Sequence, residues 1–169
     1  MTQINFEDLN GLRTKFKDKK IVFCSGSFDL THAGHILFFE DCKKFGDILI
    51  VSVGGDKLLK KNKGDLRPIL NENIRLKTID SLKPVDYCFI EPPFDNLNTL
   101  YGLEKTFNLL RPNIYVINED AFNIEYRKDL CKRYNVILFI LERHCPKEFE
   151  GISTTKIIDK IKSLKDISN

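Results

Sequence analysis

The sequence predicts an α/β fold, a single doubly wound domain with a five-stranded parallel sheet in a Rossmann-like arrangement. Short, almost continuously apolar runs alternate with amphipathic helical runs along the whole chain. Apolar runs that lack in/out alternation are typical of strands buried on both faces of a parallel sheet. The length of 169 residues suits one domain, and no linker or repeat interrupts the pattern, so we expect residues 1–169 to form a single domain.

Each expected element follows from its own apolar pattern. The expected strands are 21–25, 48–53, 87–90, 114–117 and 136–141. The expected helices between them, with apolar residues three or four apart, are 35–45, 71–82, 97–110, 124–134 and 154–164. An opening helix over 6–16 has apolar residues at 6, 9, 12 and 16, so we expect residues 1–18 to pack on the outside of the domain.

Composition and charge exclude several classes of protein. Hydrophobic residues make up 42% and charged residues 30%, which is the balance of a folded chain rather than a disordered one. A net charge of +3 is too small for a nucleic-acid clamp, so no nucleic acid partner is expected. The longest apolar runs have strand length, and the first twenty residues lack the apolar core of a secretory signal. We therefore expect no membrane association and a cytoplasmic location.

The five cysteines show neither CxxC nor Cys/His ligand spacing. Cys24, Cys42 and Cys88 lie inside apolar segments, where a free thiol acts as a small buried hydrophobe. Cys131 and Cys145 complete the set. We expect no zinc site, no disulfide framework and no metal-ligating residues.

The loop after the first strand, SGSFDLTHAGH over 25–35, holds the most unusual residues of the chain. Ligands of doubly wound folds bind at the carboxyl ends of the strands, and the small residues at 25–27 let a ligand approach the backbone closely. His32 and His35 share one face of the following helix start, where free N–H groups favour phosphate. Their imidazoles could donate hydrogen bonds to a phosphoryl oxygen, although a histidine at a helix start is otherwise a cap or a surface residue.

Two further segments carry candidate phosphate-binding groups. Four lysines follow the second strand. We expect Lys57 and Lys61 on a solvated face, and Lys60 and Lys63 near phosphate. Near the carboxyl end, 151–155 reads GISTT before an apolar helix. One hydroxyl residue is enough to cap a helix, so three in a row favour phosphate binding as well.

These motifs resemble those of a known enzyme family. GSFDLTHAGH resembles the HxGH signature of the cytidylyltransferase-like nucleotidyltransferases, a branch of the HUP superfamily, and GISTTKI resembles their second signature. The resemblance covers about residues 20–162. It implies an enzyme that joins a nucleoside triphosphate to a phosphate monoester and releases pyrophosphate, with the GISTT helix facing HxGH.

The resemblance also implies the site residues. The catalytic residues are expected to be His32, His35, Lys63 and Lys60, with Lys63 slightly favoured over Lys60 for the triphosphate. The nucleotide-binding residues are expected to be Ser25, Gly26, Ser27, Phe28, Gly34, Asp56, Arg75, Asn118, Asp120, Gly151, Ile152, Ser153, Thr154 and Thr155. For Arg75 the alternative is an ion pair with Glu72. Mg²⁺ is expected to arrive with the nucleotide, and the chain is expected to form a homodimer.

The choice of nucleotide stays open between two subfamilies. EGISTTKI is closest to cytidylyltransferases that activate glycerol, choline or ethanolamine phosphate, although Glu148 and Phe149 replace their Arg-Thr pair. KGDLRPILNENIR and the alanine of HAGH resemble heptose 1-phosphate adenylyltransferases, although 118–120 is Asn-Glu-Asp in place of their Gly-Gly-Asp. We expect CTP, with ATP and a sugar 1-phosphate as the alternative and a non-catalytic nucleotide-binding module as a third reading. The acceptor is expected near 118–120 and the loop 142–149.

Overall fold

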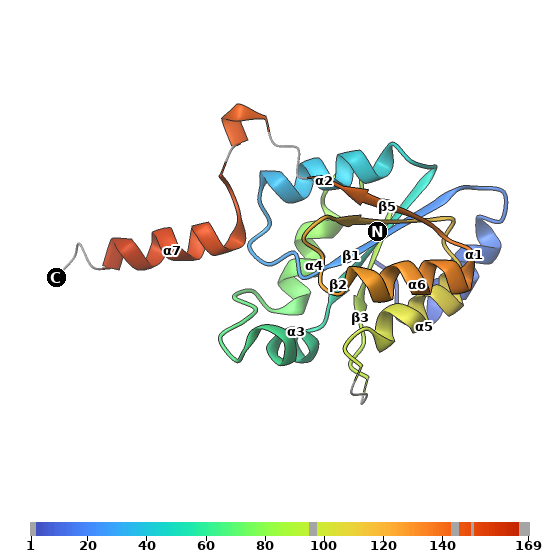
Figure 1. Ribbon diagram of the computed structural model, residues 1–169, viewed down its shortest axis with the longest axis horizontal. Coiled ribbons are helices and arrows are strands. Elements are labelled where there is room, and N and C mark those ends of the chain that lie inside the picture. The colour runs from blue at the N-terminus through green and yellow to red at the C-terminus, as the bar shows by residue number, and fades with distance from the viewer. Residues whose placement is uncertain (1–2, 95–97, 143–145, 150, 166–169) are drawn as a thin grey trace.

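The computed structural model has a five-stranded parallel sheet with helices on both faces (Figure 1). It describes residues 3–94, 98–142, 146–149 and 151–165. The strands are β1 (Ile21–Gly26), β2 (Ile48–Gly54), β3 (Tyr87–Glu91), β4 (Ile114–Asn118) and β5 (Ile137–Leu141). Their order is β3-β2-β1-β4-β5, and every neighbouring pair is parallel. The predicted fold class is confirmed, and the strand ends lie within one residue of those expected.

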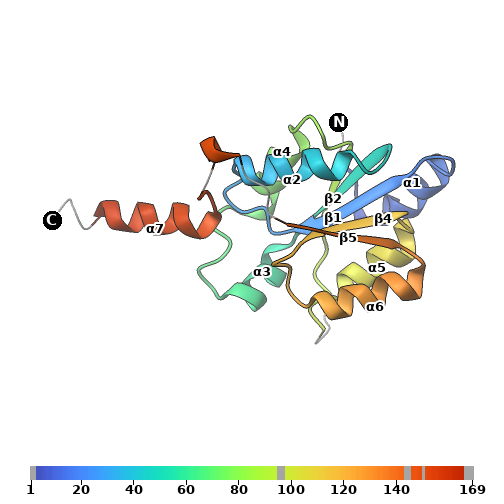
Figure 2. The ribbon, with the colours of Figure 1, turned by 45° about the horizontal axis from the view of Figure 1, so that its top comes forward.

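The helices divide between the two faces of the sheet (Figure 2). They are α1 (Leu9–Lys15), α2 (Ala33–Lys43), α3 (Asp56–Lys63), α4 (Glu72–Asp80), α5 (Tyr101–Leu110), α6 (Ile124–Tyr134) and α7 (Thr154–Lys165), with short 3₁₀ turns η1 (Phe6–Asp8) and η2 (Lys147–Phe149). Helices α1, α5 and α6 cover one face, and α2 and α4 cover the other. Helix α3 is not among the predicted helices; its sequence DKLLKKNK contains only two apolar residues.

Alternate residues of each central strand enter the two apolar cores, one on each side of the sheet. In β1, Ile21 and Phe23 face the core under α1 and α5, whereas Val22 and Cys24 face the core under α2 and α4. Both sets are fully buried, which explains why β1 is continuously apolar. The expected burial on both faces is wrong for β5, which lies at the edge of the sheet and exposes Ile137 and Ile140. Cys24, Cys42 and Cys88 are buried as expected, Cys131 is buried as well, and Cys145 lies outside the described residues.

Helix α7 projects away from the sheet, and only its first turn approaches the domain (Figures 1 and 2). Its N-terminus lies at the carboxyl edge of the strands, where the Thr154 hydroxyl donates a hydrogen bond to the Asp29 carbonyl at 2.8 Å. Among the described residues, no helix has the length and the apolar character needed to cross a membrane. The carboxyl edge of the sheet therefore gathers the loop of β1, the end of β2 and the start of α7.

Candidate functional site

A cavity of about 1060 Å³ opens along the carboxyl ends of the strands. Its wall comes from the β1–α2 loop, α3, the β4–α6 loop and the start of α7. The predicted site residues that line it are Ser25, Gly26, Ser27, Phe28, His32, Gly34, His35, Lys63, Asn118, Asp120, Ile152, Ser153, Thr154 and Thr155. Lys60, Asp56, Arg75 and Gly151 do not line it.

The two histidines begin α2 and lie against each other. His32 is the N-cap of the helix, and its ring stacks on that of His35 with centroids 3.9 Å apart. The His32 backbone N–H donates to Nδ1 of His35 at 3.4 Å. A neutral His35 ring then carries its proton on Nε2, which can donate to a phosphate oxygen. A Cβ at Gly34 would lie 3.1 Å from Cε1 of His32, so the glycine between the histidines makes room for the first ring.

The loop before the histidines holds an unusual backbone conformation. Phe28 and Leu30 have φ values of 46° and 48°, a left-handed region that costs a non-glycine residue roughly 1–3 kcal/mol. Asp29 between them is 1% exposed, and its carboxylate accepts hydrogen bonds from Arg67 and from the backbone N–H groups of Ile69 and Leu70. The segment before α4, which contains Arg67, Ile69 and Leu70, therefore holds the β1–α2 loop in place through Asp29. Asp29 therefore has an internal structural role.

Arg75 supports the same loop and corrects a prediction. Its side chain is fully buried, and its guanidinium donates to the carbonyls of Ser27, Gly54 and Leu70 and to the Asp56 carboxylate at 2.7 Å. A group with no exposed surface cannot contact a ligand in the cavity, so direct nucleotide contact by Arg75 is wrong for this geometry. The carboxylate of Asp56 is engaged in the ion pair with Arg75. Glu72, the alternative ion-pair partner expected for Arg75, instead accepts a hydrogen bond from the Asp56 backbone N–H.

The lysines of α3 separate into two groups. Lys63 lines the cavity, and its ammonium donates to the Ser27 hydroxyl at 2.9 Å. Desolvation, followed by the nearby charge of Arg67, lowers the pKa of Lys63. Lys60 is exposed and does not line the cavity, so its contact with the triphosphate stays a prediction that this geometry does not support. Lys61, expected on a solvated face, lines the cavity instead.

The start of α7 completes one wall of the cavity. Ser153 accepts the Lys156 backbone N–H at 3.2 Å and so caps the helix, whereas Thr154 is bonded to the loop of β1. Gly151 has a φ of 77°, which only glycine adopts without strain, so it shapes the turn rather than the cavity. The N-termini of α2 and α7 thus meet at one cavity, as the GISTT prediction required. Glu150 lies outside the described residues.

Two charged residues of the site were not predicted from the sequence. Arg127 of α6 lines the cavity and donates hydrogen bonds to the Tyr115 hydroxyl and the Phe122 carbonyl. Glu91 ends β3 beside Gly54 of β2 and is 8% exposed. Burial raises the pKa of Glu91 to about 7, against a smaller opposing effect of the Arg127 charge. No local motif marks either residue; the only signal was their position after a strand or in a helix near the ligand edge.

The described residues offer little to hold a metal ion by themselves. They contain no group of three or more His, Cys, Asp or Glu side chains close enough to bind one. Asp29 is engaged by Arg67 and backbone N–H groups, so it is not available as a ligand. Asp120 is a carboxylate that lines the cavity. A cation bound here would therefore depend mainly on ligands that a substrate brings.

This sheet, with two helix N-termini, two histidines and a lysine at its carboxyl edge, defines an α/β domain whose ligand edge is suited to phosphate. A family model described as cytidylyltransferase-like matches residues 23–160, and the chain belongs to that family.

Similar proteins agree with this membership. A protein of Campylobacter jejuni subsp. doylei named bifunctional protein HldE is 38% identical over 152 residues, which are 89% of this chain and 30% of that protein. A protein of the same name from Helicobacter pylori is 36% identical over 154 residues, or 91% of this chain and 30% of that protein. The chain thus spans about 30% of the length of these curated relatives.

Solved structures show the same fold. A lipopolysaccharide core biosynthesis protein from Thermoplasma volcanium has a TM-score of 0.57 and 28% identity, covering 76% of this chain and 99% of its own. A pantoate–beta-alanine ligase from Francisella tularensis has a TM-score of 0.65 and 19% identity, covering 96% of this chain and 77% of its own, and supports the fold alone.

Proposed function

We propose that the chain is an adenylyltransferase that transfers AMP from ATP to a sugar 1-phosphate, such as heptose 1-phosphate, and releases pyrophosphate. The observation that carries the proposal is the convergence of His32, His35, Lys63 and the start of α7 on one cavity. Positioning and charge neutralisation are what phosphoryl transfer needs from a protein. A merely nucleotide-binding module would not require both helix N-termini and both histidines at the same place.

In the proposed reaction an oxygen of the acceptor phosphate attacks the α-phosphorus of the triphosphate, and pyrophosphate leaves in line. The bond from the α-phosphorus to the bridging oxygen breaks as the new phosphorus–oxygen bond forms, without a covalent enzyme intermediate. His35, donating from Nε2, and His32 stabilise charge on the transferring phosphoryl oxygens. Lys63 and the N–H groups of α7 bind the rest of the triphosphate.

ATP is now favoured over the CTP that the GISTT motif led us to expect. The relatives named HldE and the segment KGDLRPILNENIR, which resembles heptose 1-phosphate adenylyltransferases, both support the alternative reading. The likeness to a lipopolysaccharide core biosynthesis protein supports a sugar acceptor. We keep CTP with a polyol or aminoalkyl phosphate as the second candidate because EGISTTKI favours it.

We also propose that Mg²⁺ accompanies the nucleotide. The ion would neutralise the phosphates that leave as pyrophosphate. Asp120 is one of the carboxylates that line the cavity, and the described residues contain no cluster of metal-ligating side chains, which supports an ion carried mostly by the triphosphate. Because ATP is made inside cells, the proposal carries a cytoplasmic location with it.

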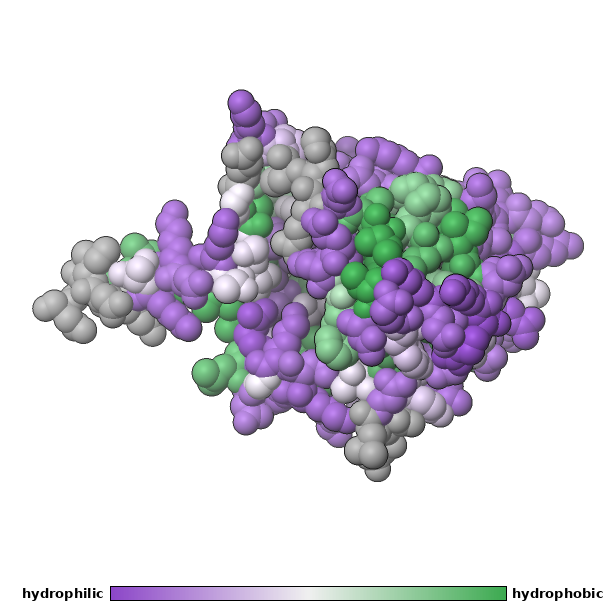
Figure 3. Space-filling view, in the orientation of Figure 1, coloured by the Kyte–Doolittle hydropathy of each residue, from purple (hydrophilic) through white to green (hydrophobic). Residues whose placement is uncertain are grey.

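A homodimer remains a proposal of its own. Figure 3 shows a hydrophobic patch at the position of β5, where Ile137 and Ile140 are 59% and 40% exposed. Ile161 and Leu164 on the projecting α7 are 51% and 55% exposed. These apolar groups support association of two copies. Light scattering at micromolar concentration should give twice the mass of the 19.6 kDa chain, and a monomer would contradict the proposal.

The experiment for the activity is a matrix of nucleotides and acceptors. ATP, CTP, GTP and UTP with Mg²⁺ are each paired with heptose 1-phosphate, mannose 1-phosphate, glycerol 3-phosphate and phosphocholine, and pyrophosphate release is measured. We expect release with ATP and the sugar 1-phosphates. Release with CTP and glycerol 3-phosphate instead would favour the second candidate, and release with none would refute the enzymatic reading.

A further inference from the structure

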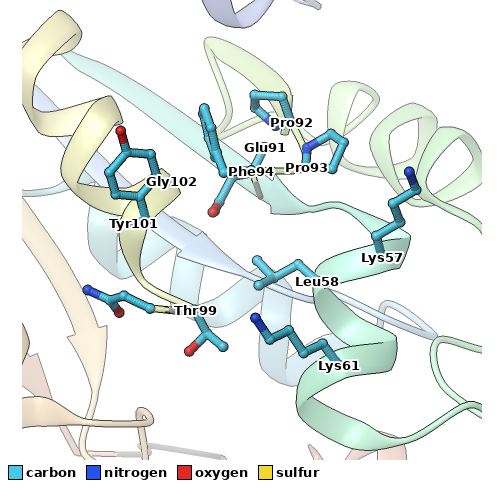
Figure 4. Close-up of a pocket in the computed structure, with 11 residues that line it drawn as sticks. Lys57, Leu58, Lys61, Glu91, Pro92, Pro93, Phe94, Thr99, Tyr101 and Gly102 are labelled. Atoms are coloured by element: carbon cyan, nitrogen blue, oxygen red, sulfur yellow. The ribbon is translucent and has the colours of Figure 1, made fainter. Parts of the chain in front are cut away.

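A second cavity of about 490 Å³ lies beside the main one, between α3, the loop after β3 and the start of α5 (Figure 4). Leu58, Lys61, Glu91 and Thr99 line both cavities, so the second is a side chamber that opens into the proposed active site. Its volume falls within the range of small-molecule sites. None of the nucleotide-binding residues expected from the motifs lines it.

Glu91 is the unusual member of this side chamber. Its carboxylate is more than nine-tenths buried, and in the described part of the chain no group donates a hydrogen bond to it. A Cβ at Gly102 of α5 would lie 2.0 Å from Oε1 of Glu91, so the glycine leaves the space that the carboxylate occupies. The fully enclosed side-chain atoms without a partner in the described residues do not include the oxygens of Glu91, so this carboxylate faces the chamber, where a ligand can donate hydrogen bonds to it.

The other walls supply complementary groups. Lys61 extends from α3 toward Thr99 across the side chamber, Lys57 lies on its rim, and the rings of Phe94 and Tyr101 form the opposite side (Figure 4). The side chamber thus combines a hydrogen-bond acceptor, ammonium donors and aromatic surface. A polyhydroxylated ring matches all three: its hydroxyls donate to the carboxylate and accept from ammonium groups, and its C–H surface packs on aromatic rings.

We propose that this side chamber binds the sugar of the acceptor, with Glu91 accepting hydrogen bonds from sugar hydroxyls and selecting a polyhydroxylated phosphate monoester. The inference rests on the proposed function and places the acceptor on the β2–β3 side of the cavity, away from the expected loops at 118–120 and 142–149. Phosphocholine is the competing acceptor. Its trimethylammonium group is attracted by the carboxylate of Glu91 and by the rings of Phe94 and Tyr101, but it offers no hydrogen-bond donor to Glu91, and the ammonium groups of Lys57 and Lys61 repel it.

The test compares Glu91→Gln with wild type. The amide keeps the shape of the side chain but is a weaker acceptor than a carboxylate, so KM for heptose 1-phosphate should rise roughly 10- to 100-fold. KM for ATP should change less than about twofold, which a general loss of structure would not produce. Gly102→Ala, which displaces the same carboxylate, should raise the acceptor KM in the same direction. Glu7→Gln, an acid-to-amide change at an exposed residue, is the matched control.

Calorimetry with heptose 1-phosphate alone separates this inference from the proposed activity. Binding to wild type that Glu91→Gln weakens supports the side chamber whether or not turnover occurs. Turnover with ATP but an unchanged acceptor KM in Glu91→Gln overturns the side chamber and leaves the proposed function standing. Tighter binding of phosphocholine than of heptose 1-phosphate overturns the sugar assignment. Absence of both turnover and binding in wild type overturns both proposals.

Discussion

The buried carboxyl of Glu91 makes a prediction about stability that is independent of any substrate. Its pKa is about 7 in the folded protein, compared with 4.5 for an ordinary glutamate, and desolvation is the main cause. A carboxyl whose folded pKa is raised contributes its full stability below about pH 4.5 and loses it as the pH rises through about 7. Between 4.5 and 7, at roughly 1.36 kcal/mol per pKa unit, the loss is about 3 kcal/mol.

Glu91→Gln removes this titration because an amide stays neutral. The free energy of unfolding of the variant, minus that of wild type, should therefore increase by roughly 2–3 kcal/mol between pH 5 and pH 8. Urea unfolding at four pH values in this window measures the difference, and subtraction cancels the titration of all other groups. A constant offset can arise from the amide itself, so the slope with pH is the informative quantity.

Glu7→Gln should show no such slope, because Glu7 is exposed. A difference for Glu91→Gln that varies by less than about 0.5 kcal/mol from pH 5 to pH 8 would mean that the carboxyl titrates as an ordinary glutamate. The side chain would then be solvated in solution. That result would also remove the reason for considering the carboxylate an unsatisfied hydrogen-bond acceptor in the side chamber.

Three further outcomes concern the main cavity. His32→Ala and His35→Ala should each lower turnover roughly 10²–10³-fold with a much smaller loss of ATP affinity, whereas unchanged turnover per folded molecule in His32→Ala would leave that residue only as a cap of α2. Lys63→Met should lower kcat/KM for ATP roughly 10- to 100-fold in pyrophosphate-release assays, and an unchanged value would exclude Lys63 from the triphosphate. Arg75→Met should lower the free energy of unfolding by about 3–5 kcal/mol in urea, because four acceptors around the buried guanidinium lose their donor; a loss below about 1 kcal/mol would contradict its supporting role.

The sheet was predictable because its pattern is local. Strands buried on both faces must be apolar at every position, so their ends are visible where polar residues or glycine begin. Helix α3 was not predicted because its surface is mostly solvated and Leu58 and Leu59 are the only apolar residues of its lysine-rich sequence. It is held in place by its position after β2 and by Glu72 at its N-terminus rather than by periodicity.

The position of candidate site residues was predictable only where they are neighbours in the sequence. HAGH and GISTT each combine a helix start with their functional side chains, so both were found. Whether a charged side chain faces a cavity or lies beneath it depends on tertiary packing, which is why Arg75 and Asp56 were assigned to the nucleotide. Glu91 shows the converse, since an isolated glutamate after a strand gives no sign in the sequence that it will be buried.

The contacts of the segment 67–75 also change what its resemblance to heptose 1-phosphate adenylyltransferases means. Its arginines and backbone N–H groups hold Asp29 and Ser27, so this segment sets the shape of the HxGH loop rather than the base-binding end of the cavity. Under the proposed function the shape of this loop matters to the acceptor, because the loop positions His32 and His35 beside the transferring phosphate. GISTT caps α7 through Ser153 and tethers it to the loop of β1 through Thr154. The likeness of 67–75 to heptose 1-phosphate adenylyltransferases therefore concerns the loop that would hold the acceptor phosphate, which is consistent with the proposed sugar 1-phosphate.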